Sequence, residues 1–124
     1  MELEKVDGYK KIYQVDDFQK EFEKTVSETK PNGRYHKWLR KQLFSLEDHG
    51  YDALKFENFE PLSDTNPKLY AIRYPRSKKN PRIIYIYVDD CKVYLLHAFK
   101  ETKTSDYNQA VKTAEKRAKL FVRE

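Results

Sequence analysis

The chain has 124 residues, of which 36% are charged and 15% are aromatic. This length is enough for one domain, which we expect to span residues 1–124, and the ten Tyr and seven Phe exclude a disordered chain. The net charge is +5, and segment 68–103 holds nine Lys or Arg against three Asp or Glu, while the rest is nearly neutral. This local surplus of positive charge favours a surface that binds phosphate.

Three further features indicate where the protein acts. The single cysteine, Cys91, has no second cysteine with which to form an intramolecular disulfide, which is typical of a reducing compartment. The first residues do not resemble a signal peptide, and no apolar run is long enough to span a membrane. The sequence therefore predicts a cytoplasmic protein that is not bound to a membrane.

The first half of the chain predicts a short strand and two helices. A strand is expected over residues 9–15, followed by an amphipathic helix in which apolar residues recur every four positions within segment 18–26. Asp16 or Asp17 precedes this helix and can cap it. Segment 31–33, Pro-Asn-Gly, breaks the helix. A second amphipathic helix then runs over about residues 35–46, and the two form a helical hairpin.

The second half predicts strands. Segments 53–59 and 69–74 are candidate strands, and segment 75–81 is a basic turn with a proline at each end. Segment 82–88, Arg-Ile-Ile-Tyr-Ile-Tyr-Val, is the strongest strand signal because β-branched and aromatic residues fill it. Segment 92–99 follows a tight Asp-Asp turn, so these last two strands form an antiparallel hairpin.

The chain closes with a predicted helix. Asp106 is expected to cap this helix, with Gln109 completing a capping box, and apolar residues including Tyr107 form one face. The predicted order is β-α-α-β-β-β-β-α. We therefore expect an α+β fold in which an antiparallel sheet carries an N-terminal helical hairpin and a C-terminal helix.

Three motifs in the second half resemble the RelE/ParE superfamily of toxins, and they are most similar to its HigB branch, which includes phage-derived members. The family carries an R-I-x-Y strand, an L-L-H-x-F strand followed by a Lys- and Thr-rich loop, and a closing helix with Ala and Arg at similar spacings. The corresponding segments here are 69–73, 81–85, 95–100 and 102–104, followed by Ala110, Ala114 and Arg117. In the N-terminal half only the order of elements is similar.

The resemblance implies a type II toxin that inhibits translation. RelE- and HigB-like toxins cut mRNA in the ribosomal A site without a metal or other cofactor: the ribose 2′-OH attacks the adjacent phosphate and the 5′ oxygen leaves. It also implies a cognate antitoxin, expected to be a small helix-turn-helix protein. The sequence itself has no Cys/His cluster with metal-ligand spacing and no glycine-rich phosphate loop.

Two arginines are the first candidates for the catalytic site. Arg82 matches the Arg of the R-I-x-Y motif, and a guanidinium suits the stabilisation of a phosphate-centred transition state because it stays charged and offers a planar fork of donors. Arg73 lies on the preceding strand, where related toxins often carry a basic residue. The alternative is that Arg82 is a solvated strand-end residue and that Arg73 forms a cross-strand ion pair.

The remaining candidates follow the central strands. Lys103 is expected at the rim of the site, and Tyr107 matches an aromatic residue that can stack on a base or donate a proton, although it also lies on the apolar face of its helix. His97 is an acid/base candidate, although a single strand histidine is more often structural. His36 and His49 receive no role. Candidate RNA-binding residues are Lys100, Arg76, Lys78 and Lys79.

The sequence also departs from the family pattern. Ala71 stands where some relatives have a second basic residue, Glu101 where many have a base, and Ser105 where Pro is frequent. Glu101 would either weaken phosphate attraction or take part in proton transfer. Two alternatives to an mRNA endoribonuclease therefore stay open: a ParE-like protein that inhibits DNA gyrase, and a phage-derived protein that keeps the fold without activity.

Overall fold

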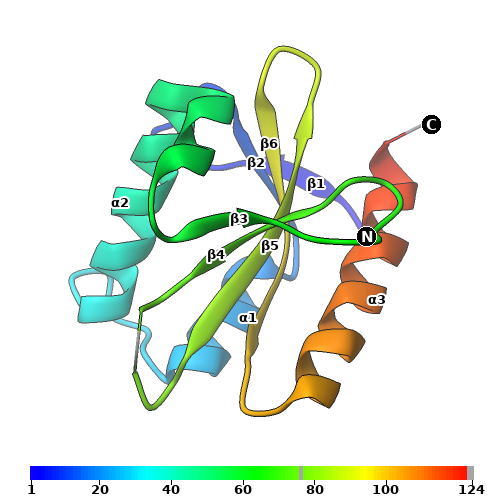
Figure 1. Cartoon of the computed structure of the whole chain (residues 1–124). Helices are drawn as coiled ribbons and strands as arrows, with labels where there is room; N and C mark the ends of the chain where they lie inside the picture. Colours follow the sequence, from blue (N-terminus) through cyan, green and yellow to red (C-terminus); the bar gives the residue numbers. More distant parts are fainter. Residues whose placement is uncertain (76, 123–124) are drawn as a thin grey trace.

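The computed structural model describes residues 1–75 and 77–122, and it shows an α+β fold built on one six-stranded sheet (Figure 1). The sheet order is β1-β2-β6-β5-β4-β3. All neighbouring strands are antiparallel except β2 and β6, which are parallel. The strands are β1 (Leu3–Lys5), β2 (Ile12–Val15), β3 (Phe59–Pro61), β4 (Tyr70–Arg73), β5 (Pro81–Val88) and β6 (Lys92–Lys100). The helices are α1 (Phe18–Val26), α2 (Arg34–His49), the 3-10 helix η1 (Gly50–Lys55) and α3 (Thr104–Phe121).

The predicted fold class is confirmed. In Figure 1 the twisted sheet runs between α2 on one side and α3 on the other, with α1 behind it. Segments 3–5 and 12–15 extend the sheet beyond β6, so the N-terminal segment and the second half of the chain form one sheet. No helix in the described part of the chain is long and apolar enough to span a membrane.

The central strand β5 carries the core. Its residues Ile83 to Tyr87 are all buried, as expected for a strand covered on both faces. The hydroxyl of Tyr87 donates to the backbone oxygen of Gly50 over 2.9 Å, which ties η1 to one of these faces. On α1 the predicted stripe of Phe18, Phe22 and Val26 is confirmed as buried.

The structure differs from the predicted elements in four places. Segment 53–59 is not a strand: η1 ends at Lys55 and β3 begins only at Phe59, because buried Ala53 packs as part of a helical turn. The strand predicted over residues 9–15 is β2, which begins at Ile12 and not at Tyr9. The backbone N–H groups of Lys10 and Lys11 donate to the carboxylate of Glu47 instead of to a neighbouring strand.

The other two differences are at the ends of the chain. Strand β1 was not predicted because its three residues, Leu-Glu-Lys, show no apolar alternation, and pairing with β2 alone defines it. Helix α3 begins at Thr104, and Asp106 lies in its first turn, so Asp106 is not the residue before the helix. Asp17 does precede α1, but its side chain makes no capping hydrogen bond.

An ionic cluster joins α1, β6 and α3. Arg117 donates to both carboxylate oxygens of Glu21, at 2.8 and 2.7 Å, and to the backbone oxygen of Leu96 at 2.8 Å. His97 Nδ1 lies 3.0 Å from Glu21. Burial alone would raise the pKa of Glu21, but the hydrogen bonds from His97 and Arg117 outweigh it and lower the pKa to about 2.

We predict that Glu21→Gln destabilises the protein by ~1–3 kcal/mol at pH 7, because it leaves Arg117 without its carboxylate partner. The folded-state pKa of Glu21 is depressed from 4.5 to about 2. Its contribution is therefore fully present above pH 4.5 and is lost as the pH falls towards 2. Urea unfolding at several pH values should show the gap between wild type and variant closing in that window. A gap that does not change with pH, or an equal loss in the exposed control Glu57→Gln, would contradict this role.

Candidate functional site

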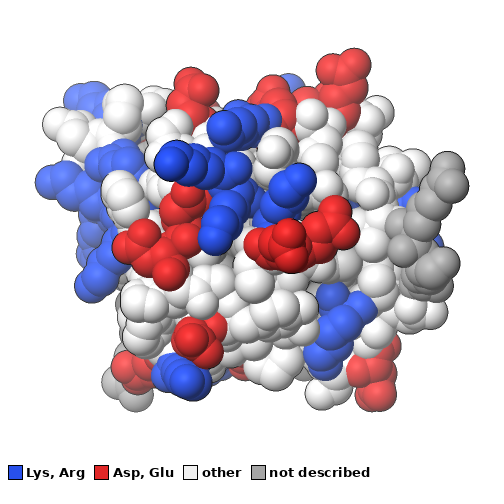
Figure 2. All heavy atoms as spheres, turned by 90° about the horizontal axis from the view of Figure 1, so that it is seen from above, with Lys and Arg blue, Asp and Glu red and all other residues white. Residues whose placement is uncertain are grey.

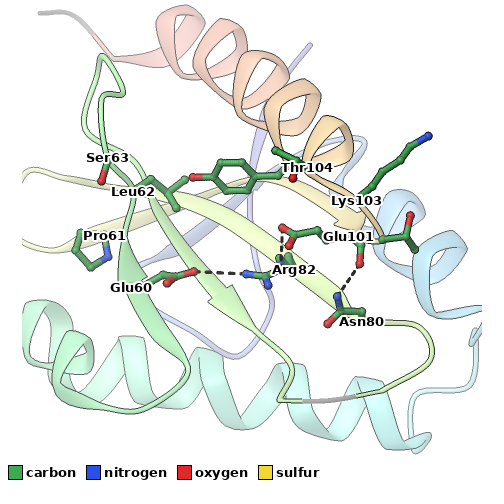
Figure 3. A pocket seen from close by; sticks show the side chains of 11 residues that line it. Glu60, Pro61, Leu62, Ser63, Asn80, Arg82, Glu101, Lys103 and Thr104 are labelled. Carbon is green, nitrogen blue, oxygen red and sulfur yellow. Dashed lines mark hydrogen bonds and ion pairs between the residues drawn. The ribbon is translucent and has the colours of Figure 1, made fainter.

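A hollow of about 570 Å³ lies at the end of the sheet where β3, β5, β6 and α3 meet (Figure 3). Its walls come from three segments that are distant in sequence: residues 60–63, residues 80 and 82, and the loop 101–103 with the first turn of α3 that follows it. Figure 3 shows Arg82 in the middle, between the side chains of Glu60 and Glu101. The hollow is therefore built around one arginine.

Strand register positions Arg82. It is the second residue of β5 and pairs directly with Arg73 on β4, while Glu60 on β3 pairs with Ala71. Since side chains on one strand alternate between faces and paired residues share a face, Glu60, Arg73 and Arg82 all project from the same face. Ala71 has no side chain beyond Cβ and lies between them, which lets the longer side chains meet above it.

Two carboxylates hold the Arg82 guanidinium. Glu101 Oε1 lies 3.0 Å from Arg82 Nε, and Glu60 Oε1 lies 3.5 Å from Nη1. The Arg82 side chain is only 16% exposed, so this is a largely desolvated cation between two partly exposed anions. The Nε–H group is buried, yet it makes no well-aligned hydrogen bond within the described structure. A buried donor of this kind is costly unless an acceptor reaches it.

Arg73 lies beside this arrangement. Its Nε is 3.6 Å from the same Glu60 oxygen, and its side chain is 46% exposed. Arg73, Arg82 and Asn80 line an adjoining hollow of about 360 Å³. Two arginines thus share one carboxylate. The cross-strand ion pair weighed as an alternative for Arg73 is present through Glu60, and the exposed side chain also faces this second hollow.

The start of α3 supplies Lys103 and Tyr107. The carboxylate of Asp106 accepts hydrogen bonds from the hydroxyl and N–H of Thr102 and from the N–H of Lys103. These bonds, those from Thr102 first, lower the pKa of Asp106 and fix the loop that carries Glu101. Lys103 is exposed at the rim.

Tyr107 lines the hollow as a half-buried side chain. Burial, and then the charges of Glu60 and Glu101, raise the pKa of Tyr107, and nearby Arg82 offsets this only in part. The phenol therefore stays protonated at neutral pH and can act as a hydrogen-bond or proton donor. The carboxylates of Glu60 and Glu101 are the hydrogen-bond and proton acceptors of the same site. The hollow is thus lined by a cation, Arg82, a proton donor, Tyr107, and these two bases.

The basic turn between β4 and β5 is joined to the site through Asn80. The Asn80 side chain donates to the backbone oxygen of Glu101 over 2.6 Å, and its backbone has a left-handed φ of 38°, which Asn tolerates better than most residues. Its N–H donates to the Ser77 hydroxyl over 2.9 Å. Asn80 therefore links the turn to the loop that carries Glu101.

The structure brings together Arg82, Lys103 and Tyr107, with Arg73 adjoining them. It places His97 elsewhere, because Glu21 binds the imidazole and Phe99 stacks on it. Lys78 and Lys100 are exposed, Lys79 is partly buried, and none of them lines the hollow. Arg76 lies outside the described residues.

Sequence reasoning missed Glu60 and Asn80. Glu60 lies 22 positions from Arg82 in a strand of three residues, and no local pattern marks it. Asn80 carried a weak signal as an Asn before a proline in a turn. Glu101 was singled out only as a departure from the family pattern, and the structure gives it a direct contact with Arg82.

The surface charge is mixed. Figure 2 shows Lys and Arg gathered at the side where α2 lies in Figure 1, with Asp and Glu interspersed further in. Among the described residues, no three His, Cys, Asp or Glu side chains are grouped to hold a metal ion. The chemistry open to the site is the binding of an anion by Arg82, together with proton transfer among Tyr107, Glu60 and Glu101.

Fold and site are those of a small α+β protein with an arginine-centred hollow. Residues 31–119 match the model of a family described as phage-derived, Gp49-like protein (DUF891). The match covers more than half of the chain, so this protein belongs to the Gp49-like family, which is part of the RelE/HigB-like toxin fold group. No curated protein and no solved structure gave a match. The predicted superfamily is confirmed at this level, and the HigB branch stays a prediction.

We predict that removing either carboxylate strengthens anion binding. Glu60→Gln and Glu101→Gln keep the shape of the side chain but stop it competing for Arg82. A partly screened charge at this distance is worth ~1 kcal/mol, or roughly fivefold in affinity. Titration with a phosphate-linked dinucleotide blocked at the 2′ oxygen measures this effect. The exposed, distant Glu2→Gln should leave the affinity unchanged. Weaker binding by both site variants would show that the carboxylates do not compete with the anion.

Proposed function

We propose that this protein is a HigB-like toxin of a type II toxin–antitoxin pair and cuts mRNA in the ribosomal A site without a metal ion. The convergence of Arg82, Lys103 and Tyr107 on one hollow carries this proposal. Membership of a family in the RelE/HigB-like fold group supports it. The cognate partner would be a small helix-turn-helix antitoxin, as the resemblance implies.

The proposed reaction is an internal transfer at phosphorus. The ribose 2′ oxygen forms a bond to the adjacent phosphorus, and the bond between phosphorus and the 5′ oxygen of the next nucleotide breaks. A base accepts the 2′-OH proton, and an acid protonates the leaving 5′ oxygen. The products are a 2′,3′-cyclic phosphate and a 5′-OH end. The reaction consumes no water and needs no cofactor.

The site residues fit these needs. Arg82 would stabilise the negative charge that develops on the phosphate oxygens, and its buried Nε–H would then gain an acceptor. Tyr107 would protonate the leaving oxygen, because its raised pKa keeps the phenol neutral. When Arg82 turns to the phosphate, Glu101 loses its ion pair, so its carboxylate becomes available as the base.

The two carboxylates also favour one alternative, a phage-derived protein that keeps the fold without activity. With Glu60 and Glu101 both on Arg82, a phosphate must compete with two anions for the guanidinium. A protein in which this competition always fails would keep the fold without cutting RNA. Mapping of mRNA 5′ ends distinguishes an active nuclease from such an inactive protein. Breakage of DNA by gyrase in the same cells would point to a ParE-like inhibitor.

We expect Arg82→Ala to abolish growth arrest and mRNA cutting. Loss of one preorganised donor costs ~10²–10³ in rate. Mapping of mRNA 5′ ends after induction should show A-site cuts with the parent protein and none with the variant. The control is Arg40→Ala, at an exposed arginine that lines neither the hollows around Arg82 nor the one beside Lys37 and Lys41 on α2, and it should leave growth arrest and cutting unchanged. Normal growth arrest by Arg82→Ala would contradict the role of Arg82, and an absence of cuts with the parent would contradict the nuclease.

Substitutions of Tyr107 separate proton donation from packing. Tyr107→Phe keeps the ring and removes the phenolic proton, so we expect a ~10²–10⁴-fold lower cleavage rate with unchanged thermal stability. Cleavage by programmed ribosomes in a purified system measures the rate. Full activity of Tyr107→Phe together with loss in Tyr107→Ala would show that the ring stacks or packs and donates no proton.

A further inference from the structure

A third hollow, of about 370 Å³, lies against α2 and is lined by cations and aromatic rings. Lys37, Trp38 and Lys41 form one wall, together with Arg34 at the start of the helix. Tyr74, which follows β4, forms the other wall. None of these residues lines the main hollow, the one of about 570 Å³ between Glu60, Arg82 and Tyr107.

The first half of α2 carries an unbalanced positive charge. Between residues 34 and 46 there are four Lys or Arg and no Asp or Glu. Among the described residues, no carboxylate lies within ion-pair distance of Arg34, Lys37 or Lys41. Cations at a helix N-terminus oppose the helix dipole and are unfavourable there. The helix dipole therefore does not favour Arg34 and Lys37, which lie in the first turn of α2, and the charge of this face is suited to an anionic ligand.

The aromatic residues of this hollow hold a fixed cation. Arg34 Nε donates to the Tyr74 hydroxyl over 2.6 Å, and its guanidinium lies 5.4 Å from the Tyr74 ring centre and 5.6 Å from that of Tyr35. Trp38 lines the same hollow, and its buried indole N–H has no hydrogen-bond partner among the described residues. Arg34 is exposed and Tyr74 is partly buried, and arginine and tyrosine side chains can stack on nucleic-acid bases irrespective of sequence.

This hollow adjoins the site through shared lining residues. It shares Asn58, Tyr74 and Pro75 with the hollow that contains Arg73, and that hollow shares Asn80 and Arg82 with the main one. In Figure 1 the turn between β4 and β5 lies at the same end of the molecule as the start of α2. Three adjoining hollows thus form a path from α2 to Arg82.

We propose that the α2 hollow binds single-stranded RNA, namely the part of the substrate strand that extends beyond the phosphate held at Arg82. Lys37 and Lys41, one helical turn apart, would contact successive backbone phosphates, and Tyr74 with Arg34 would stack on a base. This inference rests on the proposed function for the identity of the strand. It does not require that the strand be cut.

Binding of 2′-O-methyl RNA tests this inference, because such RNA has no free 2′-OH and cannot be cleaved. Fluorescence anisotropy would compare a dinucleotide, which fills only the Arg82 site, with a strand of about ten nucleotides. Each lost phosphate contact on a single strand lowers the salt dependence of log K by ~0.7. For Lys37→Gln/Lys41→Gln we expect the slope of log K against log salt concentration to be smaller in magnitude by ~1.4. The longer strand should then bind roughly 25-fold more weakly at about 0.1 M salt.

The matched control is Lys112→Gln/Lys116→Gln, which removes two exposed lysines from α3. Support requires that the control bind the longer strand as the parent does, and that both double variants bind the dinucleotide equally. Equal losses in the two double variants would mean that only net charge matters and would overturn the inference. No detectable binding of the longer strand by the parent would also overturn it. Failure of mRNA cutting in cells, with this binding intact, would instead overturn the nuclease alone.

Discussion

The ion pairs of Arg82 with Glu60 and Glu101 are the interaction on which the rest of the site depends. A guanidinium that is only 16% exposed would be unfavourable without charged partners, since the desolvation of an isolated ion is expensive. Three strands and the loop before α3 come together to provide those partners. The ion pairs keep a cation in a sheltered hollow, and in the proposed function they also occupy that cation until an RNA phosphate displaces them.

The same arrangement relates the fold to the chemistry. Antiparallel pairing puts Arg73 and Arg82 side by side, and the hydrogen bonds of Asp106 hold the Glu101 loop against them. The cluster of Glu21, His97 and Arg117 anchors α3 to β6 at a distance from the hollow, so the first turn of α3 and Tyr107 are held in place. An exchange of Arg82 from carboxylate to phosphate then needs only side-chain movement on a rigid framework.

Local sequence predicts the helices and strands of this fold far better than the contacts between residues that are distant in sequence. Content of β-branched and aromatic residues predicted β5, the tight turn after it predicted β6 as its hairpin partner, and the four-residue spacing of apolar residues predicted α1. By contrast, β1 and β3 have three residues each and exist through pairing, which no local pattern encodes. Glu60 reaches Arg82 only because β3 pairs with β4 and β4 with β5. His97 was a reasonable acid/base candidate until Glu21, 76 positions away, was found to bind it. The charge count singled out segment 68–103 and overlooked α2, because acids elsewhere in the chain offset its cations.

The central claim is that Arg82 exchanges carboxylate partners for an RNA phosphate, and the NMR signal of the Arg82 Nε–H group reports on it directly. Assignment follows from loss of the signal in Arg82→Lys, and titration uses a 2′-O-methyl dinucleotide that cannot be cleaved. A saturable shift of this signal, reached at lower dinucleotide concentration in Glu101→Gln, is the predicted result. A signal that does not move while the dinucleotide demonstrably binds would contradict the claim, because the phosphate would then lie elsewhere.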